Sequence, residues 1–97
     1  MIDISDQHLT LVKQILHTFV PHATIWVFGS RIQGTAKPYS DLDLVMIDQQ
    51  KIPQKTYYQI MDAFEESELP FRVDVLDWYR ISEEFRCLIQ SKHVVID

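Results

Sequence analysis

Two aspartates separated by one residue are the strongest chemical signal in the sequence. Asp41 and Asp43 flank Leu42 at the start of an apolar segment that runs to Ile47. Successive side chains of a β-strand point to opposite faces, so a strand here places both carboxylates on one face and Leu42 and Leu44 on the other. Two aligned carboxylates repel each other unless a cation lies between them. Because Mg²⁺ is commonly held by one or two carboxylates together with substrate phosphates, the pair predicts a magnesium site.

A glycine-containing loop precedes the aspartates. Gly29 and Ser30 follow an apolar segment, and Gly34 comes shortly after them. Glycine lets the backbone turn sharply and approach a ligand, and amides at the start of a helix can point at an anion. Two glycines alone are also typical of an ordinary strand–turn connection, and alternating aspartates also occur on the solvent-facing side of a strand. Together, the loop and the acids favour a site for a metal ion and a nucleotide.

A third carboxylate is expected from a neighbouring strand. Asp74 lies between Val73 and Val75, and an acid inside a strand needs a cation or solvent. Asp77 comes three residues later, so its side chain points to the other face of a regular strand, and we expect it in a turn or at a helix start. In the loop, Arg31 and Lys37 are either partners that offset phosphate charge or solvated residues.

The spacing of apolar residues predicts the elements that position these side chains. Helices are expected from Ser5 or Asp6 to just before Pro21, from about Gln54 to Glu66, and after Ser82. The apolar residues expected to pack inward are Tyr57, Ile60, Met61 and Phe64 on the second helix and Phe85, Leu88 and Ile89 on the last, where we also expect Cys87 to be packed. Strands are expected at Thr24–Phe28, Asp41–Ile47 and Arg72–Leu76, with His93–Ile96 either a short strand or an extended tail. This order predicts an α/β or α+β fold in which helices pack against a small sheet.

Length and composition limit the class of protein. The chain has 97 residues, 46% of them hydrophobic, and a net charge of -5, which is typical of one globular domain spanning residues 1–97. We expect no membrane span and no secretory signal, and the acidic balance argues against binding of long nucleic acid. The only cysteine, Cys87, is compatible with a reducing cytoplasm, where we expect the protein.

The motifs occur in an order that resembles a known signature. Gly29-Ser30, Gly34, Ser40-Asp41-Leu42-Asp43-Leu44 and Asp74 are similar to the signature of the nucleotidyltransferase superfamily that includes DNA polymerase β and kanamycin nucleotidyltransferase. The small size and the Gly29-Ser30-Arg31 sequence resemble its minimal branch, the MNT proteins. The resemblance spans Thr24 to Asp77 and implies a mixed sheet flanked by helices.

The resemblance also implies a site and a reaction. Asp41, Asp43 and Asp74 are the implied catalytic and metal-binding residues, with two Mg²⁺ ions expected. The nucleotide-binding residues expected from the loop and the resemblance are Gly29, Ser30, Arg31, Gly34 and Ser40. The implied reaction transfers a nucleoside monophosphate, AMP from ATP, to an acceptor hydroxyl, and pyrophosphate leaves. Asp74 is expected where it can accept the proton of that hydroxyl.

Partners are implied by what the chain lacks. Larger members of the superfamily carry extra domains that bind the base and the acceptor, so a second polypeptide or a second copy must complete this pocket. Members of the minimal branch are commonly encoded beside a helical HEPN protein and resemble antitoxins that add AMP to a tyrosine of that toxin. Two other classes stay open: a non-catalytic module that binds a nucleotide or neutralises a partner, and, less favoured without a basic track, a fragment of a nucleic-acid polymerase.

Overall fold

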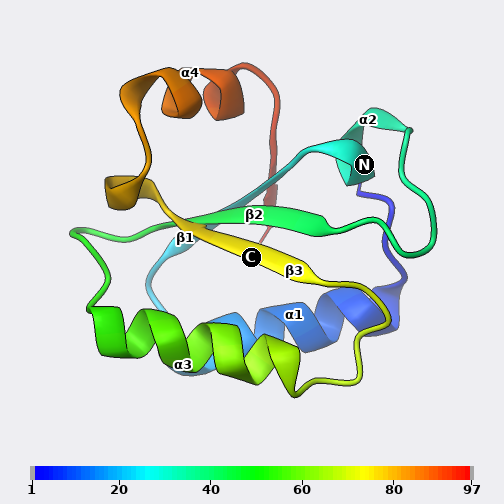
Figure 1. Cartoon of the computed structure of the whole chain (residues 1–97), viewed down its shortest axis with the longest axis horizontal. Helices are drawn as coiled ribbons and strands as arrows, with labels where there is room; N and C mark the ends of the chain where they lie inside the picture. The colour runs from blue at the N-terminus through cyan, green and yellow to red at the C-terminus, as the bar shows by residue number, and fades with distance from the viewer. Residues whose placement is uncertain (1, 97) are drawn as a thin grey trace.

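The four strands in residues 2–96, the part of the chain that this computed structural model describes, form one sheet (Figure 1). The elements are, in order, α1 (Asp6–Phe19), β1 (Thr24–Phe28), α2 (Ser30–Gln33), β2 (Leu42–Ile47), α3 (Gln54–Glu65), β3 (Val73–Asp77), the 3₁₀ turn η1 (Trp78–Arg80), α4 (Glu83–Ser91) and β4 (Val94–Ile96). None of the helices among these residues is long and apolar enough to cross a membrane.

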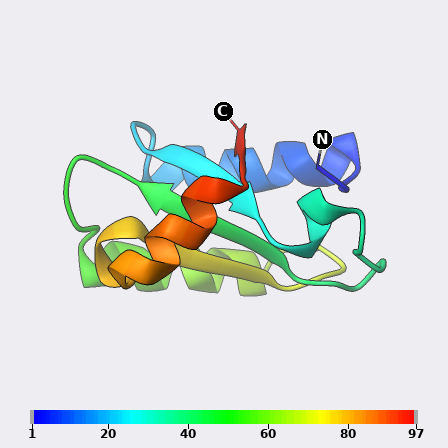
Figure 2. The ribbon, with the colours of Figure 1, turned by 90° about the horizontal axis from the view of Figure 1, so that it is seen from above.

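The sheet is mixed and has helices on both faces. The strand order is β3-β2-β1-β4. β1 runs antiparallel to both of its neighbours, whereas β2 and β3 are parallel, which requires the long crossover that α3 supplies. α1 and α3 cover one face, and α4 lies across the other (Figures 1 and 2). The mixed sheet flanked by helices that the resemblance implied is therefore confirmed.

Local sequence determines where the helices begin. Ser5 caps α1 by accepting a hydrogen bond from the His8 amide at 3.2 Å, and Ser82 caps α4 through the Phe85 amide at 3.1 Å. α3 covers the predicted segment almost residue for residue. The strands differ from the prediction by one residue at a boundary: β2 begins at Leu42, and β3 runs from Val73 to Asp77. The C-terminal segment is a strand, β4, which pairs with β1.

The main hydrophobic core lies between the sheet and helices α1 and α3. Leu42 and Leu44 of β2 are fully buried in it, as the alternation predicted, together with Val27 of β1, Val12 of α1 and Ile60 of α3. Burying one such side chain contributes about 1.5–3 kcal/mol to folding. This layer therefore supplies most of the apolar stabilisation and fixes the position of β2.

The opposite face carries aromatic side chains under α4. Trp26 stacks on His93 with ring centroids 3.9 Å apart and meets Trp78 edge-on at 5.4 Å, and Phe28 meets Phe85 edge-on at 5.8 Å. α4 is short, and of its predicted apolar residues only Ile89 is buried; Leu88 is exposed.

Three side chains expected in the interior are exposed. Besides Leu88, the thiol of Cys87 is exposed rather than packed. Met61 of α3, expected on the apolar stripe of that helix, is 44% exposed. In each case the helix forms as predicted, but no neighbouring element covers the part of its surface where this side chain lies.

Candidate functional site

The parallel pairing of β2 and β3 brings two of the predicted acids together. Asp43 is the direct partner of Asp74 in the register, and neighbouring strands lie about 4.8 Å apart. Leu42 and Leu44 face the main core, so the side chains of Asp43 and Asp74 lie on the opposite face, the one that carries α4. Asp41 lies just before β2, two residues upstream of Asp43.

Asp41 is turned toward a neighbouring cation. Its Oδ2 atom lies 3.6 Å from Nη2 of Arg72, whose side chain is 78% exposed. Among residues 2–96 no three His, Cys, Asp or Glu side chains are grouped closely enough to hold a metal ion by themselves. Exposed ion pairs of this kind are worth about 0–1 kcal/mol, so the contact with Arg72 holds Asp41 in this position only weakly.

The environment of Asp43 favours a cation. Burial, followed by the negative charges of Asp74 and Asp41, raises the pKa of Asp43 to about 6, while Arg72 acts in the opposite direction. A carboxylate with this balance of charges is stabilised by any positive ion beside it. Oxygen ligands from carboxylates are those that Mg²⁺ prefers. The three acids therefore fit a hard divalent cation in both chemistry and electrostatics.

Gly29 makes room for the Asp43 carboxylate. Its φ angle is +85°, a left-handed conformation that side chains disfavour. A Cβ atom built on Gly29 would lie 2.4 Å from Oδ2 of Asp43, well inside van der Waals contact. Two independent constraints therefore require glycine at this position. The backbone of the loop lies directly against the acid, so a group bound by the loop is also next to Asp43.

The rest of the loop turns around the short helix α2. Ser30 is its first residue, and Gly34 ends it with a φ of +76° and open space around its Cα. Ser40 closes the loop: its Oγ atom accepts a hydrogen bond from the Lys37 amide at 2.8 Å. Lys37 is itself exposed. The structure therefore groups Gly29 and Ser30 near Asp43 and places Gly34 at the far end of α2.

Arg31 has a different position from the one predicted. It is only 5% exposed, and its guanidinium donates four hydrogen bonds to the carbonyl oxygens of Asp3, Pro38 and Ser40, at 2.7 to 3.0 Å. The guanidinium also lies over the Phe71 ring, 4.2 Å from its centroid. It is neither a solvated residue nor a free phosphate ligand in this arrangement. Arg31 ties the glycine loop to the segment that leads into β2, and it thereby positions Asp41.

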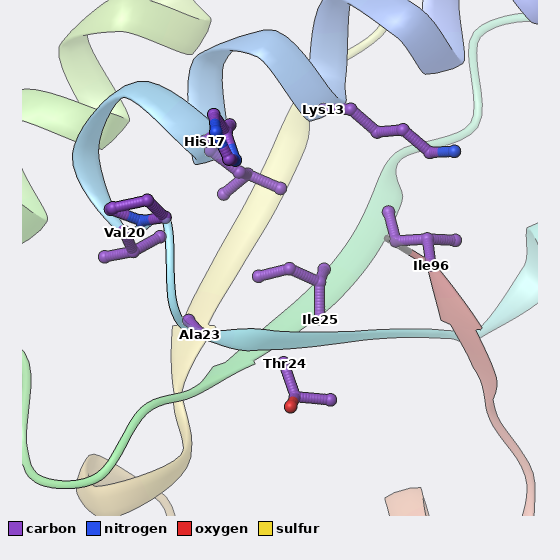
Figure 3. A pocket seen from close by; sticks show the side chains of 9 residues that line it. Lys13, His17, Val20, Ala23, Thr24, Ile25 and Ile96 are labelled. Atoms are coloured by element: carbon purple, nitrogen blue, oxygen red, sulfur yellow. The ribbon is translucent and has the colours of Figure 1, made fainter.

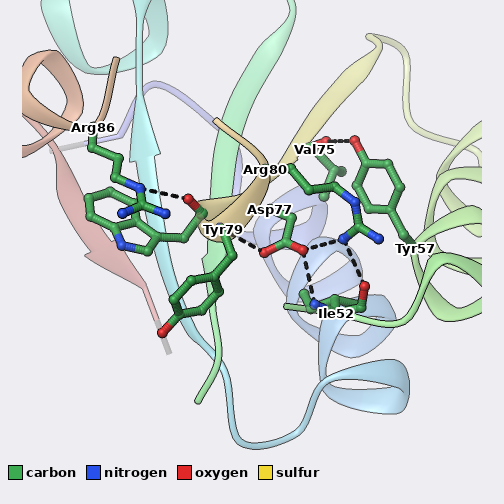
Figure 4. A network of polar contacts seen from close by, with 8 residues as sticks. Ile52, Tyr57, Val75, Asp77, Tyr79, Arg80 and Arg86 are labelled. Atoms are coloured by element: carbon green, nitrogen blue, oxygen red, sulfur yellow. Dashed lines mark hydrogen bonds and ion pairs between the residues drawn. The ribbon is translucent and has the colours of Figure 1, made fainter. Parts of the chain in front are cut away.

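Asp77 has the structural role that its position in β3 predicted. Figure 4 shows its buried carboxylate at the start of η1, where Oδ1 accepts a hydrogen bond from the Tyr79 amide at 3.1 Å and Oδ2 accepts one from the Ile52 amide at 2.9 Å. Arg80 donates to the same Oδ2 atom and also to the Ile52 carbonyl at 2.7 Å. Asp77 therefore caps the 3₁₀ turn and fixes the loop before α3.

Two cavities differ in their relation to the acids. One, of about 360 Å³, lies between the C-terminal part of α1 and the β1–β4 edge, where Lys13, His17, Ile25 and Ile96 line it (Figure 3). None of the predicted site residues lines it. The other, of about 550 Å³, lies along β3 and has Asp74 at its margin. The second cavity is therefore the one that a predicted site residue lines.

Two residues near the acids were missed from the sequence. Arg72 contacts Asp41, and it could have been found because it lies two residues before Asp74 and so shares its face. Tyr57 of α3 donates a hydrogen bond to the Val75 carbonyl at 2.7 Å. Burial and the charge of Asp74 raise the pKa of Tyr57, which keeps its hydroxyl protonated. The sequence does not indicate this contact, because the acceptor on β3 is a backbone carbonyl and not a recognisable side chain.

Comparison with known proteins gives a consistent result. Residues 10–97 match the family described as "Polymerase beta, Nucleotidyltransferase". The probable protein adenylyltransferase MntA of Haemophilus influenzae (strain ATCC 51907 / DSM 11121 / KW20 / Rd) is 47% identical over 95 residues, which cover 98% of this chain and 83% of the relative.

Solved structures show the same fold. A crystal structure of a toxin–antitoxin with AMP-PNP aligns with a TM-score of 0.75 and 21% identity, over 89% of this chain and 69% of the other. The tri-AMPylated Shewanella oneidensis HEPN toxin in complex with MNT antitoxin aligns with a TM-score of 0.66 and 19% identity, over 92% and 70%.

The family match covers most of the chain, and the sequence relative covers nearly all of it. The fold and the adjacency of Asp43 and Asp74 agree with the resemblance seen in the sequence. This chain therefore belongs to the polymerase beta nucleotidyltransferase family of enzymes.

Proposed function

We propose that this enzyme transfers AMP from ATP, with Mg²⁺, to a hydroxyl group of a HEPN-like toxin and acts as its antitoxin. The observation that carries the proposal is the pairing of Asp43 with Asp74 across β2 and β3, with Gly29 against the Asp43 carboxylate. The 47% identity to a probable protein adenylyltransferase supports AMP as the transferred group and a protein as the acceptor.

The proposed roles of the residues follow from their positions. Asp41, Asp43 and Asp74 would hold the Mg²⁺ ions, which when bound supply positive charge to the phosphates during an in-line displacement. Gly29 and Ser30 would contact the triphosphate through the loop backbone and the serine hydroxyl. Further contacts to the nucleotide from the same loop are proposed for Gly34 and Ser40, and exposed Lys37 is available to offset phosphate charge.

Arg31 would act on the nucleotide only through the loop. Its four hydrogen bonds to carbonyl oxygens keep the glycine loop and the segment before Asp41 in one arrangement. Positioning of this kind lowers the entropic cost of bringing substrate and catalytic groups together. Arg31 is therefore a positioning residue in this proposal.

The proposed reaction forms one bond and breaks one. The acceptor oxygen bonds to the α-phosphorus of ATP, the bond from that phosphorus to the oxygen bridging it to the β-phosphate breaks, and pyrophosphate leaves. The proton of the acceptor hydroxyl passes to the Asp74 carboxylate, which is exposed beside Asp43 and so accessible from outside.

A protein partner is proposed for two reasons. Asp74 is exposed, so the candidate site is open to water along β3, and nucleotidyl transfer gains from excluding water. Two solved structures with this fold are a toxin–antitoxin with AMP-PNP and a HEPN toxin in complex with MNT antitoxin. The expected partner is a helical HEPN protein encoded by an adjacent gene.

The exposed thiol of Cys87 agrees with the expected cytoplasmic location.

The test is transfer of a labelled nucleotide. The purified chain is incubated with ATP labelled at the α-phosphate and Mg²⁺, with and without the HEPN protein encoded beside it. We expect label on the toxin, none with chelator, and none with the Asp41→Asn/Asp43→Asn double variant. Asp6→Asn, an exposed change at the start of α1, is the matched control and should transfer normally. A stable complex that never becomes labelled would identify a non-catalytic, partner-neutralising module instead.

A further inference from the structure

The outer edge of β3 has backbone groups that are not paired with another strand. The Leu42 amide donates to the Arg72 carbonyl at 2.9 Å, so in this parallel ladder the amide and carbonyl of Asp74 also face β2. Those of Val73 and Val75 therefore face away from the sheet. The Tyr57 hydroxyl, which bonds to the Val75 carbonyl from α3, marks that outer side (Figure 4). β3 is an edge strand, so no strand formed by residues 2–96 occupies the position next to it.

A groove accompanies this edge. The cavity of about 550 Å³ runs between β3 and α3, and its apolar lining includes Met61, Phe64, Leu69 and Val73. Met61 is 44% exposed although its neighbours in the groove are better buried. An extended segment paired with β3 presents alternate side chains to opposite faces, so one set would enter this groove.

The remaining side chains of the added segment would lie on the face of the sheet that carries Asp43 and Asp74. Asp43 and Asp74 are direct partners in the ladder, and a segment added to β3 extends that row by one position at the strand spacing of about 4.8 Å. The residue opposite Asp74 therefore lies on the same face as both carboxylates. A hydroxyl-bearing side chain at that position reaches the place where transfer must occur.

Charge indicates the kind of segment. Glu65 lines the groove. Three further exposed acids lie close to it in sequence, in the C-terminal half of α3 and the turn after it: Asp62, Glu66 and Glu68. Arg72 is the one basic residue among those that line it in the described part of the chain. A segment with basic side chains is complementary to this rim, and an acidic one is repelled.

We propose that the edge of β3 is the docking surface for the acceptor: an extended, basic segment of the partner protein adds to β3 as a further strand, places apolar side chains in the groove and sets its hydroxyl opposite Asp74. Addition of a strand to a free sheet edge is an established mode of peptide recognition. The catalytic consequence rests on the proposed function, whereas the docking itself does not.

Hydrogen exchange tests the docking without requiring catalysis. The probe is the proposed partner, a HEPN toxin, complexed with the inactive Asp43→Asn variant. The amides of Val73 and Val75 should exchange rapidly in the free chain, and at least one should be protected by tenfold or more in the complex. Protection caused by ATP alone, or by concentrating the free chain, would assign the edge to the nucleotide or to a second copy and overturn the proposal.

Two pairs of variants test the consequence for transfer. Val73→Pro removes an outward amide and leaves the β2–β3 ladder intact, and Val73→Thr is its control. Met61→Glu puts charge into the groove, and Tyr58→Glu, 53% exposed on the same helix but outside the groove, is its control. We expect Val73→Pro and Met61→Glu to lower kcat/KM for the toxin at least tenfold with ATP binding within twofold of wild type. Val73→Thr, which keeps the outward amide, should lower kcat/KM less than Val73→Pro does, and Tyr58→Glu should stay within twofold of wild type.

The outcomes separate the two proposals. Amide protection in a complex that never transfers AMP would support the docking surface and reject the proposed function. Transfer that is insensitive to both Met61→Glu and Val73→Pro, in a complex whose Val73 and Val75 amides stay unprotected, would reject the docking surface and support the proposed function. If the Val73→Pro variant does not fold, the Met61→Glu variant and the exchange measurement still test the docking surface.

Discussion

The two faces of the sheet are built from alternate residues of the same strands and have opposite characters. Toward α1 and α3, Leu42 and Leu44 are fully buried among apolar side chains. On the other face, Asp43 lies between them in sequence and beside Asp74 in space. The first face therefore only stabilises the fold, whereas the second combines the aromatic packing under α4 with acids whose mutual repulsion opposes folding. The comparison teaches that stability and reactivity can be changed independently here by substituting adjacent residues.

The negative charges on the face that carries Asp43 and Asp74 lower the stability of the folded chain. A carboxyl whose pKa is raised to about 6 by burial and by its neighbours is less stable as an ion in the folded chain than in the unfolded one. The apolar face offsets this cost. Strain or repulsion retained at one place in an otherwise consistent structure is typical of functional sites.

Substitutions of the neighbouring residues Asp43 and Leu44 in β2 should give the largest difference between the two faces of the sheet. Asp43→Asn should lower AMP transfer by at least about 10³-fold while raising the stability of the metal-free protein. Leu44→Ala should lower the free energy of unfolding by about 2–5 kcal/mol while leaving the transfer rate per folded molecule within a few-fold. Urea unfolding and labelled-ATP transfer on both variants measure the two effects. Equal activity losses in both variants would show that the faces are not separable.

The second largest effect is expected when the same substitution is made at the two glycines of the loop. Gly29→Ala puts a Cβ against the Asp43 carboxylate as well as into a left-handed φ, and we expect a loss of transfer of about 100-fold, equivalent to 2.7 kcal/mol. Gly34→Ala meets only the φ penalty, about 1–2 kcal/mol of stability, and should remain active. Kinetics at a temperature where both variants are folded make the comparison. An active Gly29→Ala enzyme would contradict the close approach of loop and acid.

The two arginines near the loop test positioning against surface charge. Arg31→Lys breaks a buried fork of four hydrogen bonds and its contact with Phe71, so we expect about 2 kcal/mol of destabilisation and a several-fold higher KM for ATP. Arg72→Lys alters an exposed ion pair and should change stability by less than about 0.5 kcal/mol. Thermal unfolding and ATP titrations check both. Comparable effects of the two changes would count against the positioning role of Arg31.

The smallest expected effect is a pH dependence of stability. The pKa of Asp43 is raised in the folded chain, so its contribution is favourable below about pH 4, its ordinary range, and is lost as the pH rises through about 6. With chelator present, Asp43→Asn should therefore gain on wild type as the pH rises from 4 to 7.5, by on the order of 1 kcal/mol after allowance for solvent screening. A gap between the two proteins that stays constant with pH would reject this electrostatic account.

Much of the fold was predictable because its signals are local. Ser5 and Ser82 as helix caps, the alternation around Leu42 and Leu44, and the turn role of Asp77 each depend on a few consecutive residues, and the structure confirms them. The predicted group of acids rested on the same kind of alternation. The sequence also indicated Asp74 as a third carboxylate from a neighbouring strand, and the resemblance implied the same role. The β2–β3 register that makes Asp74 the direct partner of Asp43 comes from the structure.

The missed features all depend on long-range packing. The sequence spacing does not show that Arg31 is buried, because its acceptors are carbonyl oxygens of residues as distant as Asp3. Equally, the apolar stripe of a helix does not show which part of it remains uncovered, and Leu88 and Met61 were assigned to the interior for that reason.

The position of Asp74 on an edge strand also affects solubility. A short strand with flanking valines and free backbone groups is a template for self-pairing and aggregation. A second copy paired there in register would bring two Asp74 carboxylates to within about 5 Å of each other, which like charges resist. Asp74 therefore protects the unpartnered chain from aggregating. A variant such as Asp74→Val should lose activity and precipitate as well, so light scattering must accompany any assay of this position.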